Sequence, residues 1–187
     1  APLPSVPLRA AHGQPRADGT ATAPLSLMQQ RVWYLEQLQL GRTVFNVPSA
    51  HHLHGPLDLG ALERALTELV ARQPALRTVI RTVDGEPMQT ILPAGPVALP
   101  VEDLTTTPAD QRERALARRL DDEVARSFDL SGEPAGPGGG VTGLFRVRLF
   151  KMDRQHHVLF FMPHHAVWDG WSFDLFYVEM AALYGAY

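Results

Sequence analysis

Apolar residues recur along this chain at two spacings, and each spacing predicts one type of element. A repeat of three or four residues marks one face of a helix, whereas alternation or a short apolar run marks a strand. Helical spacing follows Ser26, Asp58 and Thr107, and it appears again over residues 172–184. Runs typical of strands fall at residues 45–53, 76–83, 88–92, 97–101, 144–150 and 156–162.

Local signals support several of these boundaries. Ser26 stands three residues before Gln29, the arrangement of a capping box at a helix start. Asp58 is a good N-cap for the next helix. Asp84 and Gly85 form a turn pair between two strand-like runs, so a hairpin is expected there.

The order of these elements predicts an α+β fold. Helices and strands mix without a strict βαβ repeat, so we expect a mixed, mostly antiparallel sheet flanked by helices. Residues 1–23 are rich in Ala, Pro, Gly and Thr without an apolar period, and we expect a disordered linker there. The folded unit is therefore expected over residues 24–187, with a flexible glycine-rich loop at 131–143.

Composition narrows the class of protein. The 187 residues are 45% hydrophobic and 20% charged, as in a globular domain with a core. A net charge of −3 argues against a general nucleic-acid binder. The absence of cysteine excludes disulfides, thiolate metal sites and a cysteine nucleophile. The same absence makes the cytoplasm the default location. No apolar run is long enough for a membrane span, and the start is not expected to be a signal peptide.

Candidate chemistry concentrates where a predicted strand ends and a helix begins. His164 and His165 stand side by side, and Asp169 and Gly170 follow. Extended backbone cannot aim two neighbouring side chains into one pocket, so one imidazole should face the site. A neutral imidazole can accept a proton near neutral pH, because its ordinary pKa is about 6.5.

The residues alone leave other interpretations open. Both histidines fit a hydrogen-bonded core, and His164, His165 and Asp169 fit a metal site with imidazole and carboxylate ligands. The Asp169–Gly170 pair also fits a simple turn before a helix.

Three stretches together resemble one family. The sequence HHAVWDG at 164–170 is similar to the HHxxxDG signature of nonribosomal peptide synthetase condensation domains and related CoA-dependent acyltransferases. Residues 26–35 resemble that family's motif SxAQxRLWxL, and residues 72–80 resemble RHExLRTxF. The departures are Met28, Gln73, Pro74 and Ile80.

The resemblance implies roles for individual residues. His165 would be the catalytic histidine, acting as general base toward an attacking amine or orienting that amine. His164 and Gly170 would support its loop, and Asp169 would pair with Arg77. Ser172 would line the substrate tunnel. Trp168 would either line the tunnel or pack in the core, and the core is favoured.

It also implies partners and a wider architecture. The chain would be the N-terminal subdomain of a chloramphenicol acetyltransferase-like domain whose C-terminal subdomain is absent. Upstream and downstream carrier proteins would bring substrates on phosphopantetheine arms, and the parent chain would include an adenylation domain. The domain itself would bind no cofactor and no metal. We expect weak activity at best from this half alone.

Two other functions remain as alternatives. One is a related O-acyltransferase or ester-forming domain, and the other is a non-catalytic carrier-docking fragment. The remaining histidines receive no role: at least one of His51, His52 and His54 is expected at the surface, as are His156 and His157. Four aromatic residues are expected in the core: Trp33, Phe160, Phe161 and Trp171.

Overall fold

Two long strands at the centre of the larger sheet bury side chains on both of its faces. The computed structural model describes residues 18–38, 43–132 and 143–187. Its larger sheet has the order β2–β7–β6–β5, with β2 at Ser49–His54, β5 at Val101–Asp103, β6 at Phe145–Lys151 and β7 at His156–Pro163. Strand β7 pairs antiparallel with β2 and β6, while β5 pairs parallel with β6.

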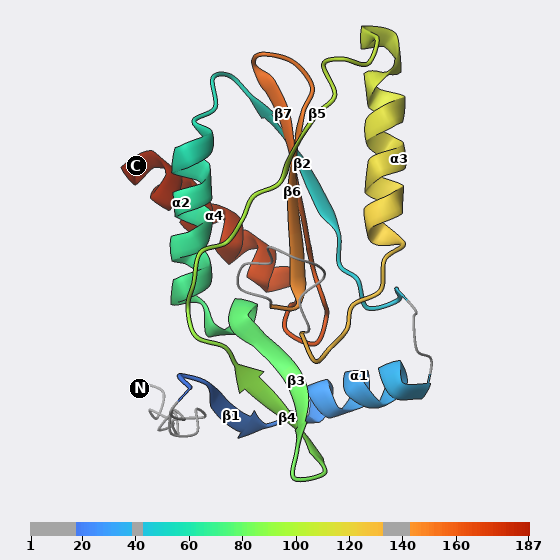
Figure 1. The fold of residues 1–187 in the computed structure, drawn as a ribbon, viewed down its shortest axis with the longest axis vertical. Coiled ribbons are helices and arrows are strands. Elements are labelled where there is room, and N and C mark those ends of the chain that lie inside the picture. Colours follow the sequence, from blue (N-terminus) through green and yellow to red (C-terminus); the bar gives the residue numbers. More distant parts are fainter. Residues whose placement is uncertain (1–17, 39–42, 133–142) are drawn as a thin grey trace, which may run out of the picture.

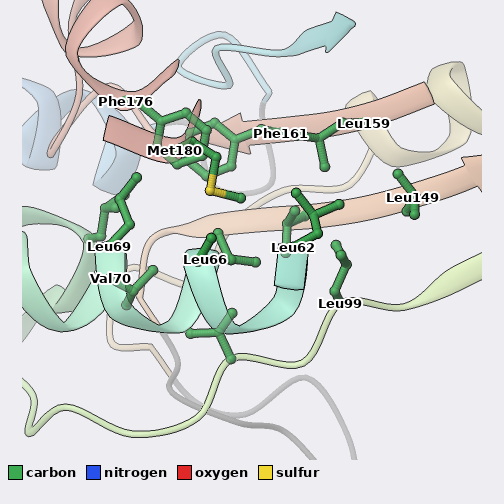
Figure 2. Close-up of a cluster of buried hydrophobic side chains, with 14 of the residues drawn as sticks. Leu62, Leu66, Leu69, Val70, Leu99, Leu149, Leu159, Phe161, Phe176 and Met180 are labelled. Carbon is green, nitrogen blue, oxygen red and sulfur yellow. The ribbon is translucent and has the colours of Figure 1, made fainter. Parts of the chain in front are cut away.

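Helices cover both faces of this sheet (Figure 1). Helices α2 (Leu59–Arg72) and α4 (Gly170–Ala186) pack on one face, and α3 (Arg112–Val124) packs on the other. Figure 2 shows the first interface, in which apolar side chains of α2 and α4 meet those of β7. The labelled residues there include Leu62, Leu66, Leu69, Leu159, Phe161, Phe176 and Met180. The opposite face buries Leu104, Leu116, Phe150, Val158, Phe160 and Met162.

A smaller sheet stands at one end of the larger one. It has the order β1–β4–β3, with β1 at Ala21–Pro24, β3 at Thr78–Val83 and β4 at Glu86–Ile91, and all pairings are antiparallel. Helix α1 (Leu27–Leu38) follows β1 and lies beside this sheet (Figure 1). Two short 3₁₀ helices, η1 (Pro74–Arg77) and η2 (Ala109–Gln111), precede β3 and α3.

The predicted α+β class is confirmed, but some boundaries were wrong. Residues 21–24 form β1 and Ala23 is buried, so the linker does not extend to residue 23. The strand expected at 97–101 is limited to Val101–Asp103, and the one expected at 76–83 begins with a 3₁₀ turn. Residues 1–17 and most of the predicted loop, 133–142, lie outside the described residues.

Within the described part of the chain, no helix combines the length and the apolar character that crossing a membrane requires.

Close backbone packing at Gly143 predicts a strong cost for a small substitution. A Cβ at this position would collide with the carbonyl oxygen of Leu76. Overpacking of this kind costs about 1–3 kcal/mol, so Gly143→Ala should lower the free energy of unfolding by that amount in a urea titration. The matched control is Gly185→Ala in α4, where an added Cβ would meet no atom within 4 Å apart from its chain neighbours and its own helix backbone, and alanine favours the helix. Equal stabilities for the two variants would contradict the packing shown here.

Candidate active site

The end of β7 is held by backbone hydrogen bonds from both sides. The N–H of His164 donates to the carbonyl of Leu144 at 2.8 Å, and the N–H of His165 donates to that of Phe45 at 2.8 Å. An isolated antiparallel bridge also joins Asn46 to His164. Because extended residues alternate, His164 points inward and is 1% exposed, whereas His165 lies at the surface.

One hydrogen bond fixes the tautomer of His165. Its Nδ1 atom lies 2.6 Å from the carbonyl oxygen of Trp168. A carbonyl can only accept, so Nδ1 carries the proton in this hydrogen bond. In the neutral ring, Nε2 is then the atom with a free lone pair, which makes it the atom able to accept a proton from a substrate.

His164 has the opposite tautomer and a structural environment. Its Nδ1 accepts the N–H of Ala166 at 3.2 Å, and its Nε2 lies 3.5 Å from a carboxylate oxygen of Glu36. Burial, helped by the charges of His165 and Arg146, lowers the pKa of His164 to about 4. The ring is therefore neutral at pH 7.

Glu36 is a site residue that the sequence did not reveal. It is 8% exposed, and burial raises the pKa of its carboxyl group. Glu36 and Val32 are the two buried residues of α1, and they are four positions apart. In the sequence, Glu36 stands one helical turn after the apolar Val32, and this spacing could have indicated that its side chain points toward the core.

His165 faces a cleft of about 700 Å³ between α1 and the loop that precedes α4. The loop contributes Trp168 and Asp169, and α4 contributes Ser172. Opposite them lie polar and apolar side chains of α1 and its cap together with residues of η1, β3 and β4. These opposing residues include Ser26, Met28, Gln29, Arg31, Val32, Leu35, Ala75, Thr78 and Gln89. The structure therefore brings four predicted site residues together: His165, Trp168, Asp169 and Ser172.

Asp169 begins α4 through a capping box with Ser172. Its carboxylate accepts the Ser172 N–H at 3.0 Å and the Ser172 hydroxyl at 2.7 Å. These hydrogen bonds hold the pKa of Asp169 below its ordinary value. Gly170 is the first residue of the helix, and a Cβ added there would meet no atom within 4 Å outside its immediate neighbours and its own helix backbone.

The expected ion pair between Asp169 and Arg77 is not formed. The Arg77 guanidinium donates instead to the carbonyls of Val70 at 3.1 Å, Ala71 at 3.2 Å and Leu92. Helix α2 ends close by, and the last carbonyls of a helix lack partners within it, so they are good acceptors. Arg77 therefore fastens the end of α2 to the end of β4, and burial lowers its pKa.

The aromatic expectations at the site were partly correct. Trp168 is 8% exposed and packs edge-on against Phe161 and Phe176, so the core interpretation is confirmed although the residue also borders the cleft. Trp171 is 84% exposed, so its predicted core position was wrong. The cap at Asp169 places Trp171 in the first turn of α4, on a side that faces away from the sheet.

One expectation about the other histidines needs correction, and one alternative for the HHxxxDG stretch is not supported. His157, expected at the surface, is buried because it follows the same alternation as Leu159 and Phe161. Within the residues that the structure describes, His164, His165 and Asp169 do not bring metal-ligating atoms together. The metal interpretation of the HHxxxDG stretch is therefore not supported.

Known proteins resemble this chain in both fold and sequence. The fold is chloramphenicol acetyltransferase-like, with the paired histidines at the end of a strand in the larger sheet. The starter condensation domain of rhizomide synthetase RzmA superposes with a TM-score of 0.75 at 22% identity, over 88% of this chain and 38% of that one. A family model described as "Condensation domain" matches residues 20–187, and the chain belongs to that family.

Relatives with a higher sequence identity to this chain include peptide synthetases. A linear gramicidin synthase of Brevibacillus parabrevis is 41% identical over 89% of this chain and 3% of its own length. The first condensation domain of the calcium-dependent antibiotic synthetase, solved with substrate analogue 2a, is 28% identical with a TM-score of 0.72. That match covers 86% of this chain and 36% of the solved one, so the chain spans well under half of the relatives it matches.

The neutral, buried state of His164 predicts a pH-dependent stability. Its folded pKa of about 4 lies below the ordinary 6.5, so only the unfolded chain binds the proton between these values. Stability should therefore fall as pH falls, by about 2 kcal/mol between pH 7 and pH 5 for this residue. Urea titrations at both pH values measure the change.

The control for this effect is His164→Gln, which removes the titration. The variant should lose about 2 kcal/mol less than the wild type between pH 7 and pH 5. The raised pKa of Glu36 acts in the opposite direction, and Glu36 is kept in both proteins. Identical pH profiles for the two proteins would contradict the assignment.

The separate partners of Asp169 and Arg77 predict additive effects. Asp169→Ala removes the cap and should cost about 0.5–2 kcal/mol, whereas Asp169→Asn should preserve most of it. Arg77→Lys should destabilise independently, because lysine cannot reach three carbonyls with one fork. In a double-mutant cycle the coupling energy should stay within about 0.5 kcal/mol. A coupling energy of several kcal/mol would show that Asp169 and Arg77 form the ion pair after all.

Proposed function

We propose that this chain supplies the catalytic histidine of a site that joins a carrier-bound thioester to an amine, forming an amide bond. The observation that carries the proposal is the position of His165. Its Nδ1–H is held by the Trp168 carbonyl, which leaves Nε2 as the proton acceptor of the neutral ring, and the residue lines an open cleft. Membership of the condensation family and similarity to peptide synthetases support the same reaction.

The chemistry needs one proton acceptor near the nucleophile. The amine nitrogen attacks the thioester carbonyl carbon, and the proton that it loses goes to Nε2 of His165. The tetrahedral species then breaks its carbon–sulfur bond, and the departing thiolate recovers that proton. A ring fixed through Nδ1 keeps Nε2 aimed throughout, whether it removes the proton or mainly orients the amine.

The other wall of the site is proposed to come from a C-terminal subdomain. The solved relatives are more than twice as long as the matched region, which leaves room for such a unit. Helix α1 beside the cleft also exposes large apolar side chains, with Leu27 at 83%, Met28 at 67% and Leu38 at 61%. A second subdomain packed there would bury them and close the cleft.

The partners follow from the same proposal. Upstream and downstream carrier proteins would deliver donor and acceptor on phosphopantetheine arms, and an adenylation domain in the parent chain would load one of them. This domain would need no cofactor of its own, and the reaction would take place in the cytoplasm. Without the second wall, the chain alone should be weakly active at best.

Removal of the His165 imidazole tests the function directly. In the full-length protein, His165→Ala should slow amide formation between two loaded carrier proteins by about 10²–10⁴-fold, the usual contribution of general-base catalysis. Mass spectrometry of the acceptor carrier measures the product. The matched control is His51→Ala, since His51 is an exposed histidine that contacts Tyr177 and not the cleft.

Three outcomes would count against the proposal. An unchanged rate in a folded His165→Ala variant would remove the catalytic role. Ester formation with a hydroxyl-bearing acceptor, without amide formation, would favour the O-acyltransferase alternative. Binding of loaded carriers with no transfer in the wild type would favour a docking role.

A further inference from the structure

Three histidines gather on one face of the larger sheet, away from the cleft. His52 and His54 are two residues apart on β2, so their side chains share a face. His156, the first residue of β7, lies directly opposite His54 in the antiparallel pair. This group is called the β2–β7 histidine cluster below.

The cluster brings its ring nitrogens close together. Nδ1 of His52 lies 2.7 Å from Nε2 of His156, and the three residues each offer a ligand atom with all of these atoms within 4.8 Å of one another. The ring centroids of His52 and His54 lie 5.0 and 4.6 Å from that of His156. His52 and His54 are exposed and His156 is half-buried, so the rings can turn without disturbing the core.

The chemistry of this group matches that of a divalent transition metal. Neutral imidazole is the commonest protein ligand for Zn²⁺, and three imidazoles with a water molecule complete a tetrahedral site. At Zn–N distances of about 2.0–2.1 Å, tetrahedral ligand atoms stand about 3.3 Å apart. The 2.7 Å contact would have to open slightly and the wider ones close by rotation of exposed rings. We propose that the β2–β7 histidine cluster is a binding site for Zn²⁺ or a similar divalent transition-metal ion.

Such an ion would connect the edge of the sheet to its central hairpin. Strand β2 is the edge strand of the order β2–β7–β6–β5, and just past the cluster the Gly55 N–H donates to the Gln155 carbonyl at 2.8 Å. The cluster lies at the start of β7, whereas His165 follows the end of this strand, which is itself about 24 Å long. The ion would therefore act on stability and not on the proposed amide chemistry.

Metal titration of the full chain tests the site. Isothermal titration calorimetry of the metal-free protein with Zn²⁺ at about pH 7.5, where imidazole is neutral, should show one ion bound per cluster. At a free Zn²⁺ concentration about 100 times the Kd, the melting temperature should rise by about 5–10 °C. Co²⁺ should give the visible absorption of a tetrahedral site with nitrogen ligands.

Variants on the two faces of β2 separate this site from others. His54→Ala and His52→Ala should each weaken Zn²⁺ binding at least tenfold, while their metal-free melting temperatures stay near that of the wild type. His51→Ala is the matched control, because His51 is exposed on the same strand but its ring packs against Tyr177 of α4. His165→Ala should also leave Zn²⁺ binding unchanged.

The proposal is overturned by any of three results. The first is a wild type that binds no Zn²⁺ in this titration. The second is an affinity that does not change in His54→Ala and His52→Ala. The third is an equal loss in His51→Ala or His165→Ala, which would place the ion elsewhere.

Discussion

The backbone clamp at the end of β7 is the constraint on which the site depends. Hydrogen bonds from His164 to Leu144 and from His165 to Phe45 fix the register of the two histidines. A slip of one residue would exchange the inward and outward side chains, because successive residues of a strand face opposite sides. The choice of His165 as the ring in the cleft is therefore made by main-chain geometry, before any side-chain partner acts.

Side-chain contacts then give the two rings different tasks. His164 is held neutral among Glu36, the Ala166 N–H and the rings of Phe45 and Phe128, so it serves as packing for the loop. The ring of His165 is oriented by the Trp168 carbonyl, which belongs to the residue before Asp169. Because the capping box of α4 fixes Asp169, it also fixes that carbonyl. Asp169 can thus support the ring of His165 without any contact to Arg77.

Local patterns in the sequence were enough for most elements and for the expectation that only one ring of the histidine pair faces a site, whereas the family resemblance was needed to choose His165. Alternation required that only one ring face the cleft, and the apolar periods located the four long helices. The partner of Arg77 could not be found this way. The family resemblance suggested Asp169. The turn at η1 instead brings the guanidinium back to the last carbonyls of α2, and only the folded chain reveals that proximity.

Two other differences have the same tertiary origin. Val97 and Leu99 are buried in an apolar run, yet their N–H groups donate to the side chains of Thr67 and Glu63 on α2 and not to a neighbouring strand. The run therefore packs without becoming a sheet. Strand β1 has no apolar period of its own and forms because β4 offers it an edge. In both cases the partner, and not the local sequence, decides the structure.

The exposure of His165 connects the geometry to the expected need for a second wall. A cleft open to solvent leaves water beside the imidazole, where it competes with the amine for the lone pair of Nε2 and for the thioester carbonyl. Water also screens the charge that develops during attack, so a preorganised ring accomplishes less there than in an enclosed site. Burial of the apolar surface of α1 by a partner subdomain would supply free energy for closure. If the proposed second subdomain packs there, the same event would exclude the water that favours hydrolysis over amide formation, so the proposed transfer would depend on both walls even though this chain alone orients the ring.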